Sequence, residues 1–398
     1  MSSRHLNIIH FGKFYEPYTG GIESVTSSLA AGAAARGHHV EVVCFGEPAG
    51  DAPEVISGVR VDRHRPSFKT MSQPLGLGYA VACIRKAWKR DVVHLHYPNM
   101  LAAMCALLVP PWTRVVVHWH SDVVGKGLAG IVVRPLEFLL ALRATMIIAT
   151  SENYSTASPI IRHFRRRTRV IPIGCPDYSA VYRGLTLQRA ELEASLPALR
   201  GRHVVLAVGR LVEFKGFDVL VDAASALRDD AVVVIVGEGP AKADLERAIA
   251  DKGLEDRVLL VGRQGPLRKK PLPEGEPAFV SERLLASLFH HASLLAFPSV
   301  ERAESFGVSM IEAMSFGLAV VASDIPGSGV GWVSQDGATG YSFPVRDSQA
   351  LADRCNKILS DAALRDRFSR GSSDRYKNLF RESTSVDRVC ELYAEISR

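Results

Sequence analysis

The stretch LNIIHFGKFYEPYTGGIESVTSSLAAGAAARGHHVEVVCF, residues 6–45, decides the fold class. A short apolar run stands at each end, and between them lie a loop with Gly20 and Gly21 and a helical pattern that Gly37 terminates. Strand, glycine loop, helix and strand in this order predict a βαβ unit with a parallel strand pair. The expected elements are strands at residues 6–11 and 40–45 and a helix at residues 23–36.

The same alternation of buried strands and helical segments continues in two series along the chain. The first series ends near residue 178, and the second begins at residue 203 after a polar helical segment. Two such series predict an α/β protein with two doubly wound parallel sheets. The further strands are expected at residues 92–95, 115–119, 146–150, 170–172, 203–208, 231–236, 258–261, 294–297, 319–323 and 340–343.

The length of 398 residues also favours two domains. We expect an N-terminal Rossmann-like domain at residues 1–180 and a C-terminal Rossmann-like domain at residues 200–375. The last segment is helical by pattern, and we expect residues 380–398 to cross back onto the first domain. Right-handed crossovers place the strand-to-helix loops on one edge of each sheet, so the ligand site is expected in a cleft between two such edges.

Composition and charge narrow the class of protein. With 47% hydrophobic and 23% charged residues, the chain has enough apolar surface to fold unaided. The net charge of +6 fits a solubilising surface, or an anionic partner such as a nucleotide or an acidic membrane. A nucleic-acid partner is disfavoured, because the basic residues are not interleaved with an aromatic platform.

The cysteines and the start of the chain bear on its location. The six cysteines are scattered without a CxxC pair, as expected of reduced core thiols, and the first residues lack the features of a signal peptide. The longest apolar stretches fall short of the ~20 residues that span a bilayer. We therefore expect a cytoplasmic protein without a transmembrane helix.

The segment FPSVERAESFGVSMIE, residues 297–312, is the most informative in the chain. A strand leads through a polar loop with Glu304 into a helix, whose unpaired amides and dipole suit a phosphate or sugar hydroxyls. Glu304 and Glu312 lie about 12 Å apart along the helix and suit two separate hydroxyl-bearing groups. The alternative is a helix-start charge and a surface residue. The amides at the helix start belong to Phe306, Gly307 and Val308.

The segment GRLVEFKG, residues 209–216, opens the second series. Arg210 and Lys215 lie on its loop and first helical turn, where one fork-shaped and one compact cation can neutralise a diphosphate leaving group. The alternative is that both are ordinary exposed bases, with Glu213 between them as an ion-pair partner.

Other glycine loops give weaker signals. Gly20 and Gly21 let the backbone approach a phosphate before a helix start, although the dinucleotide pattern GxGxxG is not matched. Gly237 in VGEGP lets a flat base lie against the backbone, and Arg263 in VGRQG can stack on that base. A tight-turn glycine and a solvated arginine are the alternatives.

Two HxH pairs stand at strand ends of the first series: His94 and His96 in HLHYPN, and His118 and His120 in HWHSD. Residues i and i+2 of a strand share a face, so each pair can converge. Since no Glu or Cys completes a ligand set, we expect no metal there. His120 is instead expected to contact or polarise the substrate.

Positive charge is concentrated in two runs of the first series, HFRRRTR at residues 163–169 and RKAWKR at residues 85–90. They can form a face toward an anionic membrane or a diphosphate lipid. The alternative is a solvated helix end.

In order and spacing, these motifs resemble glycosyltransferase family 4, the retaining enzymes of GT-B fold, over essentially the whole chain. The resemblance implies GT-B architecture, with two Rossmann-like domains facing across a cleft, the first for the acceptor and the second for the nucleotide-sugar donor. The matching pieces are GGIESVTSSLAAGAAARGHHVEVV, HWHSD, VIPIG, VGRLVEFKGFDVLVDA, IVGEGP and ESFGVSMIEAMSFGLAVVASD, the last with the family's E-x7-E motif.

The resemblance also implies roles for residues of the second domain. Glu304 would contact hydroxyls of the donor sugar and Glu312 the ribose, while the amides of residues 306–308 hold sugar and phosphate. Arg210 and Lys215 match the diphosphate-binding pair of the family.

In the first domain, His120 matches the histidine that approaches the transferred sugar near its anomeric centre. Gly20 and Gly21 match the loop that closes over the donor. The resemblance implies retention by front-face attack, in which the leaving phosphate takes the acceptor's proton, with no cofactor and no metal requirement.

The histidine segments are most similar to bacterial surface-polysaccharide mannosyltransferases of the family. This implies GDP-mannose as donor and a glycan or polyprenyl-diphosphate-linked glycan as acceptor, with UDP-glucose and UDP-N-acetylglucosamine as alternative donors. One departure from the family is the insertion QGPLRKKPLPEGEPAF within residues 264–280, which predicts an exposed, mobile loop near the cleft rim.

Two other classes of protein are alternatives. A nucleotide-sugar 2-epimerase shares this architecture but needs acid and base carboxylates where the first-domain loops carry glycine and histidine. A two-domain sugar-binding module, which is not an enzyme, would carry a secretion signal and no phosphate-binding bases.

Overall fold

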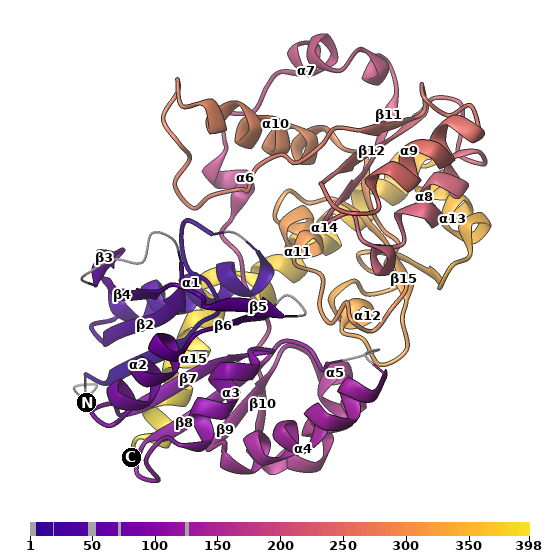
Figure 1. Ribbon diagram of the computed structural model, residues 1–398. Coiled ribbons are helices and arrows are strands. Elements are labelled where there is room, and N and C mark those ends of the chain that lie inside the picture. Colours follow the sequence, from indigo (N-terminus) through magenta and orange to yellow (C-terminus); the bar gives the residue numbers. More distant parts are fainter. Residues whose placement is uncertain (1–4, 19, 47–52, 71–72, 124–126) are drawn as a thin grey trace. The chain divides into compact units, whose positions relative to one another are not determined.

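The computed structural model describes residues 5–18, 20–46, 53–70, 73–123 and 127–398, which fold into two compact α/β units (Figure 1). The first unit comprises Met1–Gly174 with Glu382–Arg398, and the second comprises Cys175–Arg381. The boundary thus lies before the expected residue 180. The connecting segment joins the second unit because it packs on α10 (Pro277–His291), where the Leu187 amide donates to Ser287 Oγ at 2.8 Å.

An eight-stranded sheet forms the centre of the first unit, in the order β10-β9-β8-β7-β1-β2-β4-β3. All neighbouring strands are parallel except the edge pair β3 and β4. Because the chain runs outward in both directions from β1 and β7, the sheet is doubly wound. The strands are β1 (Asn7–Phe11), β2 (His39–Phe45), β3 (Glu54–Ile56), β4 (Val59–His64), β7 (Val92–Tyr97), β8 (Arg114–Trp119), β9 (Met146–Ala149) and β10 (Thr168–Val170), with β5 (Phe68–Thr70) and β6 (Gln73–Leu75) as a separate hairpin.

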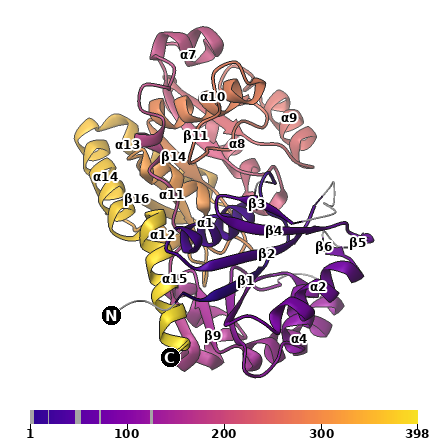
Figure 2. The same cartoon turned by 90° about the vertical axis from the view of Figure 1, so that its left-hand side faces the viewer.

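Helices cover both faces of this sheet. On one face, aliphatic side chains such as Val93, Leu95 and Val117 pack against α2, α3 and α4. The other face carries α1 and α15, and Figure 2 shows α15, in yellow, running along this unit. The helices are α1 (Gly21–Ala35), α2 (Leu77–Ala87), α3 (Met100–Leu107), α4 (Gly127–Arg143), α5 (Glu152–Ala157), the 3₁₀ segment η1 (Ile161–Arg167) and α15 (Glu382–Ile396).

The C-terminal helix α15 therefore belongs to the first unit, as predicted. A Cβ at Gly32 on α1 would lie 2.6 Å from the Val386 side chain on α15, so glycine allows the two helices to approach closely. On the same helix, Tyr393 is fully buried and hydrogen-bonds through its hydroxyl group to His94 of β7. These contacts complete the first unit with the last residues of the chain.

The second unit contains a six-stranded parallel sheet in the order β13-β12-β11-β14-β15-β16. Its central strands β11, β12, β14 and β15 are nearly continuous runs of buried, mainly aliphatic residues, as expected for a sheet covered on both faces. The strands are β11 (His203–Val208), β12 (Ala231–Val236), β13 (Val258–Leu260), β14 (Leu294–Phe297), β15 (Val320–Asp324) and β16 (Gly340–Pro344). The helices besides α10 are α6 (Tyr178–Val181), α7 (Arg189–Ser195), η2 (Pro197–Leu199), η3 (Glu213–Lys215), α8 (Phe217–Ala224), α9 (Lys242–Asp251), α11 (Val308–Ser315), α12 (Val330–Val333), α13 (Ser348–Ser360), α14 (Ala362–Arg375) and the π-helical η4 (Tyr376–Phe380).

Two features differ from the sequence-based expectation. The short strands β3 to β6 were not predicted. Strand β3 is an exposed edge strand and β5 pairs only with β6 in a hairpin, while β4 shows buried alternation only at Val59 and Val61. The helix after β11, whose first turn was expected to contain Lys215, begins at Phe217. Gly216 before it adopts a left-handed φ of 64°, and a Cβ there would lie 2.1 Å from the Pro298 carbonyl oxygen. Among the described helices, none is both long and apolar enough to cross a bilayer.

Candidate functional site

The loops after β11 and β14 meet at the centre of the second sheet. From these two strands the chain continues in opposite directions, and ligands of doubly wound sheets bind at the carboxyl ends of the strands at such a point. The β11 loop carries Arg210 and Lys215, and the β14 loop carries Glu304. A hydrogen bond of 2.8 Å from the Val300 amide to the Phe214 carbonyl joins the two loops.

Close backbone contacts join the β11 loop to the loop after β12. The Gly209 amide donates to the Val236 carbonyl at 3.0 Å, and a Cβ at Gly237 would lie 1.9 Å from the Gly209 carbonyl oxygen. A Cβ at Gly239 would lie 2.2 Å from the Leu211 carbonyl oxygen. The glycines of VGEGP are therefore required by loop packing, and the contact of Gly237 with a base stays a prediction.

Lys215 and Glu304 form an ion pair between the two central loops. Lys215 Nζ lies 2.5 Å from Glu304 Oε2, and the Ser299 hydroxyl group donates to the same oxygen at 3.3 Å. Both charged side chains are largely buried, and Lys215 Nζ lies 5.1 Å from the centre of the Phe297 ring. The partner of Lys215 is thus Glu304, and not the neighbouring Glu213 that the sequence offered.

Arg210 differs from Lys215 in its surroundings. Its side chain is exposed, and it forms no ion pair within the described part of the chain. The β11 loop therefore presents one fixed, partly neutralised ammonium group and one guanidinium group open to solvent. Such a pair can bind an anion, with Arg210 free to form a bidentate contact.

The polar loop before α11 has a fixed shape. Gly307 caps α11 with a left-handed φ of 87°, and a Cβ there would lie 2.5 Å from Met310 Cε and 2.9 Å from Phe297 Cζ. Phe306 is buried and meets the ring of Phe380 edge-on. The Ser328 hydroxyl group donates to the Glu304 carbonyl. The amide of Val308 and the positive end of the α11 dipole are therefore held in place beside Glu304.

Glu312 lies on α11 and is mostly removed from water. Burial raises the pKa of its carboxyl group to about 7, and the positive charge of Lys215 opposes this shift. A carboxyl group with such a pKa changes its charge near neutral pH. It can thus accept hydrogen bonds from hydroxyl groups with a strength that depends on pH.

The remaining predicted donor contacts lie at loop positions. Arg263 follows β13, where the Gly262 carbonyl accepts a hydrogen bond of 2.9 Å from the Gly237 amide. Arg263 is therefore next to the β12 loop. In the first unit, Gly20 directly precedes α1 with an extended backbone, and Gly21 is the first residue of that helix.

The insertion at residues 264–280 is only partly the free loop that was expected. Its first part is anchored, since the Arg268 amide donates to the Tyr182 hydroxyl group at 2.8 Å and Arg268 Nε lies 3.3 Å from Glu282 Oε2. Leu267 is buried. The exposed part is mainly residues 269–276.

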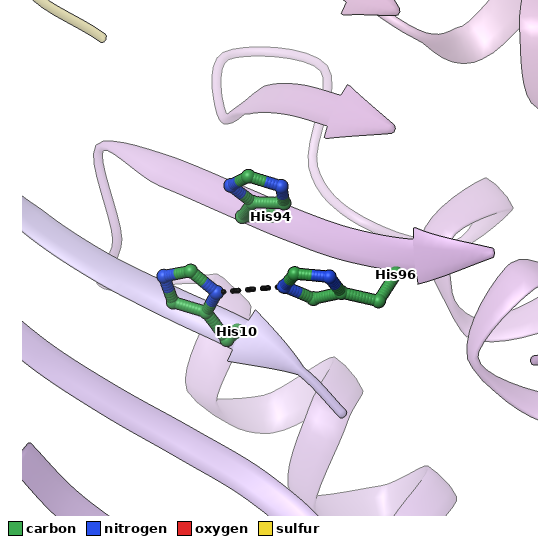
Figure 3. A group of neighbouring side chains, drawn as sticks. All are labelled: His10, His94 and His96. Atoms are coloured by element: carbon green, nitrogen blue, oxygen red, sulfur yellow. Dashed lines mark hydrogen bonds between the residues drawn. The ribbon is translucent and has the colours of Figure 1, made fainter. Parts of the chain in front are cut away.

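Five buried histidines lie together on one face of the first sheet, the face that carries α1 and α15. Figure 3 shows three of them, with a hydrogen bond of 3.1 Å between His10 Nδ1 and His96 Nε2. A second hydrogen bond of 3.1 Å joins His96 Nδ1 to His120 Nε2. The five residues are His10 on β1, His94 and His96 on β7, His118 on β8, and His120 directly after β8.

Sequence reasoning found both HxH pairs but missed His10. The signal was its position in the strand, because His10 pairs with His94 in the register of β1 and β7. Burial lowers the pKa of His10 and His120 to about 3, and it lowers the pKa values of the other three as well. All five imidazoles are therefore neutral at physiological pH.

Comparison with known protein families covers both units. The model described as "Glycosyl transferase 4-like domain" matches residues 20–176, and the model described as "Glycosyl transferases group 1" matches residues 202–361. Both halves of the chain are thus matched in the order in which the two units occur.

Curated relatives match the chain over nearly its full length. The "O-antigen chain mannosyltransferase C" of Escherichia coli is 28% identical over 98% of this chain and 99% of its own length. The "D-rhamnosyltransferase WbpZ" of Pseudomonas aeruginosa is 27% identical over 94% of this chain and 92% of its own.

Solved structures share the fold. The Anabaena protein HepE in complex with UDP-glucose covers 98% of this chain and 100% of its own, with a TM-score of 0.76 and 19% identity. Sucrose-phosphate synthase from Thermosynechococcus elongatus covers 98% and 99%, with a TM-score of 0.73 and 21% identity. Together with the two sheets described above, these matches show that the chain belongs to the family-4 type of glycosyltransferases with GT-B fold.

Proposed function

We propose that this glycosyltransferase is a retaining mannosyltransferase that uses GDP-mannose to extend a lipid-linked glycan in bacterial polysaccharide biosynthesis. The observation that carries the transfer chemistry is the Lys215–Glu304 pair at the junction of the β11 and β14 loops. A bound diphosphate would compete with Glu304 for the ammonium group. Glu304 would then be available to the hydroxyl groups of the sugar.

The identity of the sugar is supported by the two curated relatives. One is named for the transfer of mannose and the other for the transfer of D-rhamnose, which is 6-deoxy-D-mannose. Both sugars share the axial hydroxyl group at C2. UDP-glucose and UDP-N-acetylglucosamine stay as alternatives, because HepE was solved with UDP-glucose.

In the proposed reaction, the bond between the anomeric carbon and the diphosphate oxygen breaks, and the acceptor hydroxyl oxygen bonds to the same face of that carbon. The leaving phosphate oxygen takes the acceptor's proton. Arg210, Lys215 and the amides at the start of α11 stabilise the charge that develops on the diphosphate. On this proposal these residues supply the positive charge, and the reaction needs no metal ion.

A lipid-linked acceptor and a peripheral membrane position are supported by exposed apolar side chains just beyond the C-terminal ends of α2 and α3. Trp88 and Trp112 are 57% and 61% exposed, and their ring centroids lie 5.3 Å apart. Leu108, which directly follows α3, is 65% exposed. Tryptophan at an exposed apolar surface beside basic side chains is typical of proteins that lie in the membrane interface.

The two basic runs of the first unit present fewer unpaired charges than their sequences indicate. Lys86 and Arg90 both bind the buried carboxylate of Glu41. Arg85 and Lys89 are exposed. In the other run, Arg165 and Arg166 are exposed, whereas Arg169 pairs with Glu395 at 3.1 Å.

A donor panel with a matched lysine control tests the proposed function. Thermal shifts measured with GDP-mannose, UDP-glucose and UDP-N-acetylglucosamine should select GDP-mannose, since a ligand at 100 times its Kd adds about 2.7 kcal/mol to the stability of the folded state. Lys215→Ala should lower mannosyl transfer at least ~100-fold. Lys242→Ala, which removes a partly exposed lysine paired with Glu238, should not lower it. Selection of a UDP-sugar would overturn the donor, and normal transfer by Lys215→Ala would overturn the site.

A further inference from the structure

Three of the five buried histidines form a continuous chain of hydrogen bonds. His96 is its centre, with Nε2 facing His10 Nδ1 and Nδ1 facing His120 Nε2, each at 3.1 Å. In both pairs the ring centroids lie 5.4 Å apart and the ring planes differ by 21° and 13°. For two imidazoles whose nitrogens face each other in a straight line, the centroid distance equals the N···N distance plus the radius of each ring. The observed distance is close to that sum. The imidazoles in both pairs therefore meet edge to edge, nearly in line, and Figure 3 shows this for His10 and His96.

This geometry favours hydrogen bonds over a shared metal ion. His10, His94 and His96 have nitrogens close enough for a ligand set, as have His96, His118 and His120. A zinc ion would lie at about 2.0–2.1 Å from each nitrogen and thus well off the line that joins a pair facing each other at 3.1 Å. The lone pairs point along that line and not toward a common centre.

His10, at the inner end of this chain of hydrogen bonds, determines which ring nitrogens carry the protons. Each neutral imidazole carries one N–H group, so the three rings must donate in one direction or the other. If the chain donated inward, His10 Nε2 would carry a proton, yet this nitrogen is buried and has no partner in the described structure. A buried N–H group without an acceptor is rarer than an unused acceptor. The chain therefore donates outward, from His10 to His96 and from His96 to His120.

We propose that His10 and His96 are positioning residues that hold His120 in one tautomer, with its proton on Nδ1. His120 Nε2 is occupied by the bond from His96, so His120 offers a ligand only a hydrogen-bond donor. His120 is the most exposed of the five, and it stands directly after β8 at the carboxyl edge of the sheet. If the protein acts on a sugar nucleotide as proposed above, the role of His120 is to donate to a sugar or phosphate oxygen and never to accept a proton.

Histidine ¹⁵N chemical shifts of the free protein test the tautomer without any assay of activity. The expected spectrum shows His120 protonated at Nδ1 and unprotonated at Nε2. In His96→Phe this pattern should be lost, and in His96→Asn, whose side-chain amide N–H replaces Nδ1–H, it should return. His118→Phe is the control, because His118 is equally buried in the same cluster but has no hydrogen-bond partner at either nitrogen among the described residues.

Kinetics with the donor selected above give the second readout. We expect His96→Phe to lower kcat at least tenfold with KM changed less than threefold, and His96→Asn to recover most of the loss. His118→Phe should stay within threefold of the original protein. If no donor is turned over, the proposed function fails while the ¹⁵N result still decides the tautomer.

Three results would overturn the inference. One is a wild-type His120 that is protonated at Nε2. Another is a folded His96→Phe variant with unchanged His120 shifts. The third is a stoichiometric metal ion retained after dialysis, with displaced shifts of His10 and His96. Because the wild-type spectrum alone decides the first point, a variant that fails to fold does not leave the inference untested.

Discussion

At the scale of single residues, the candidate site of the second unit contains two carboxyl groups in different surroundings. Glu304 is ion-paired to Lys215 and accepts a hydrogen bond from Ser299, whereas Glu312 is half-buried and has a pKa raised to about 7. The two groups stand at opposite ends of the E-x7-E motif. Glu304 is therefore paired with a cation, whereas the raised pKa of Glu312 results mainly from its removal from water.

The raised pKa of Glu312 predicts a pH-dependent affinity for the donor. If the ionised carboxylate accepts the ribose hydroxyl groups, affinity should rise severalfold between pH 6 and pH 8, as the group loses its proton. Isothermal titration with the intact nucleotide-sugar measures this, because its diphosphate does not change charge in that range. Glu312→Gln should bind with an affinity independent of pH. An equal pH dependence in that variant would assign the effect to another group.

From the sequence alone we could predict that these residues lie on loops at one sheet edge, but not which of them contact each other. Strand endings and helix starts placed Arg210, Lys215 and Glu304 on loops at the same sheet edge. The pairing of Lys215 with Glu304 joins positions 89 residues apart and depends on which strands are neighbours. His10 was missed for the same reason, since its neighbours come from β7 and not from its own segment.

At the scale of elements, the start of α11 depends on Gly307. Its left-handed φ of 87° is unfavourable for other residues, and a Cβ would also overlap Met310 and Phe297. Gly307→Ala should therefore lower the free energy of unfolding by about 2–5 kcal/mol. It should also reduce turnover, because the α11 amides would shift. Chemical denaturation and an initial-rate assay measure the two effects.

Gly253 provides the matched control for this substitution. It has a φ of 62°, but a Cβ there would have no neighbour within 4 Å. Gly253→Ala should lower the free energy of unfolding only by the conformational cost of about 1–2 kcal/mol, and it should keep full turnover. Equal losses in both variants would show that overlap at Gly307 contributes nothing.

The element pattern was largely predictable, because buried parallel strands read as continuous apolar runs. All six strands of the second unit were expected within a few residues of their observed bounds. The edge strand β3 and its neighbour β4 were not, since Val55 of β3 is 73% exposed and only Val59 and Val61 of β4 alternate as buried residues. Helix starts fixed by tertiary contacts, such as Phe217 after Gly216, were also misplaced by a few residues.

At the scale of the whole molecule, the five buried histidines make the first unit sensitive to acid. Their pKa values are lowered in the folded state, so unfolding takes up protons and stability falls as the pH drops below about 6.5. Because unfolding would protonate several imidazoles at pH 5.5, the lost stability is on the order of several kcal/mol, which is comparable to the stability of a domain.

We therefore expect the first unit to unfold between about pH 5 and pH 6, before the second. Fluorescence of the buried Trp119 follows this transition. His118→Phe should take up about one proton fewer on unfolding. A first unit that remains folded at pH 4.5 would contradict the lowered pKa values.

The exposed Trp88 and Trp112, which follow α2 and α3, predict binding of the protein to anionic vesicles. Replacement of both Trp88 and Trp112 by serine should lower the fraction bound to vesicles with 30% anionic lipid at least about tenfold, since their indole rings would no longer enter the interface. Activity toward a water-soluble acceptor should be unchanged. Co-sedimentation at two salt concentrations measures the binding. Unchanged binding of the double variant would remove this surface from the proposal.

The position of α15 also determines which of the two units can finish folding first during translation. The first unit needs Val386 beside Gly32 and Tyr393 beside His94, so it is incomplete until α15 has left the ribosome. The second unit contains all of its own strands and helices before residue 382. The half of the protein that is translated first is therefore the half that is finished last.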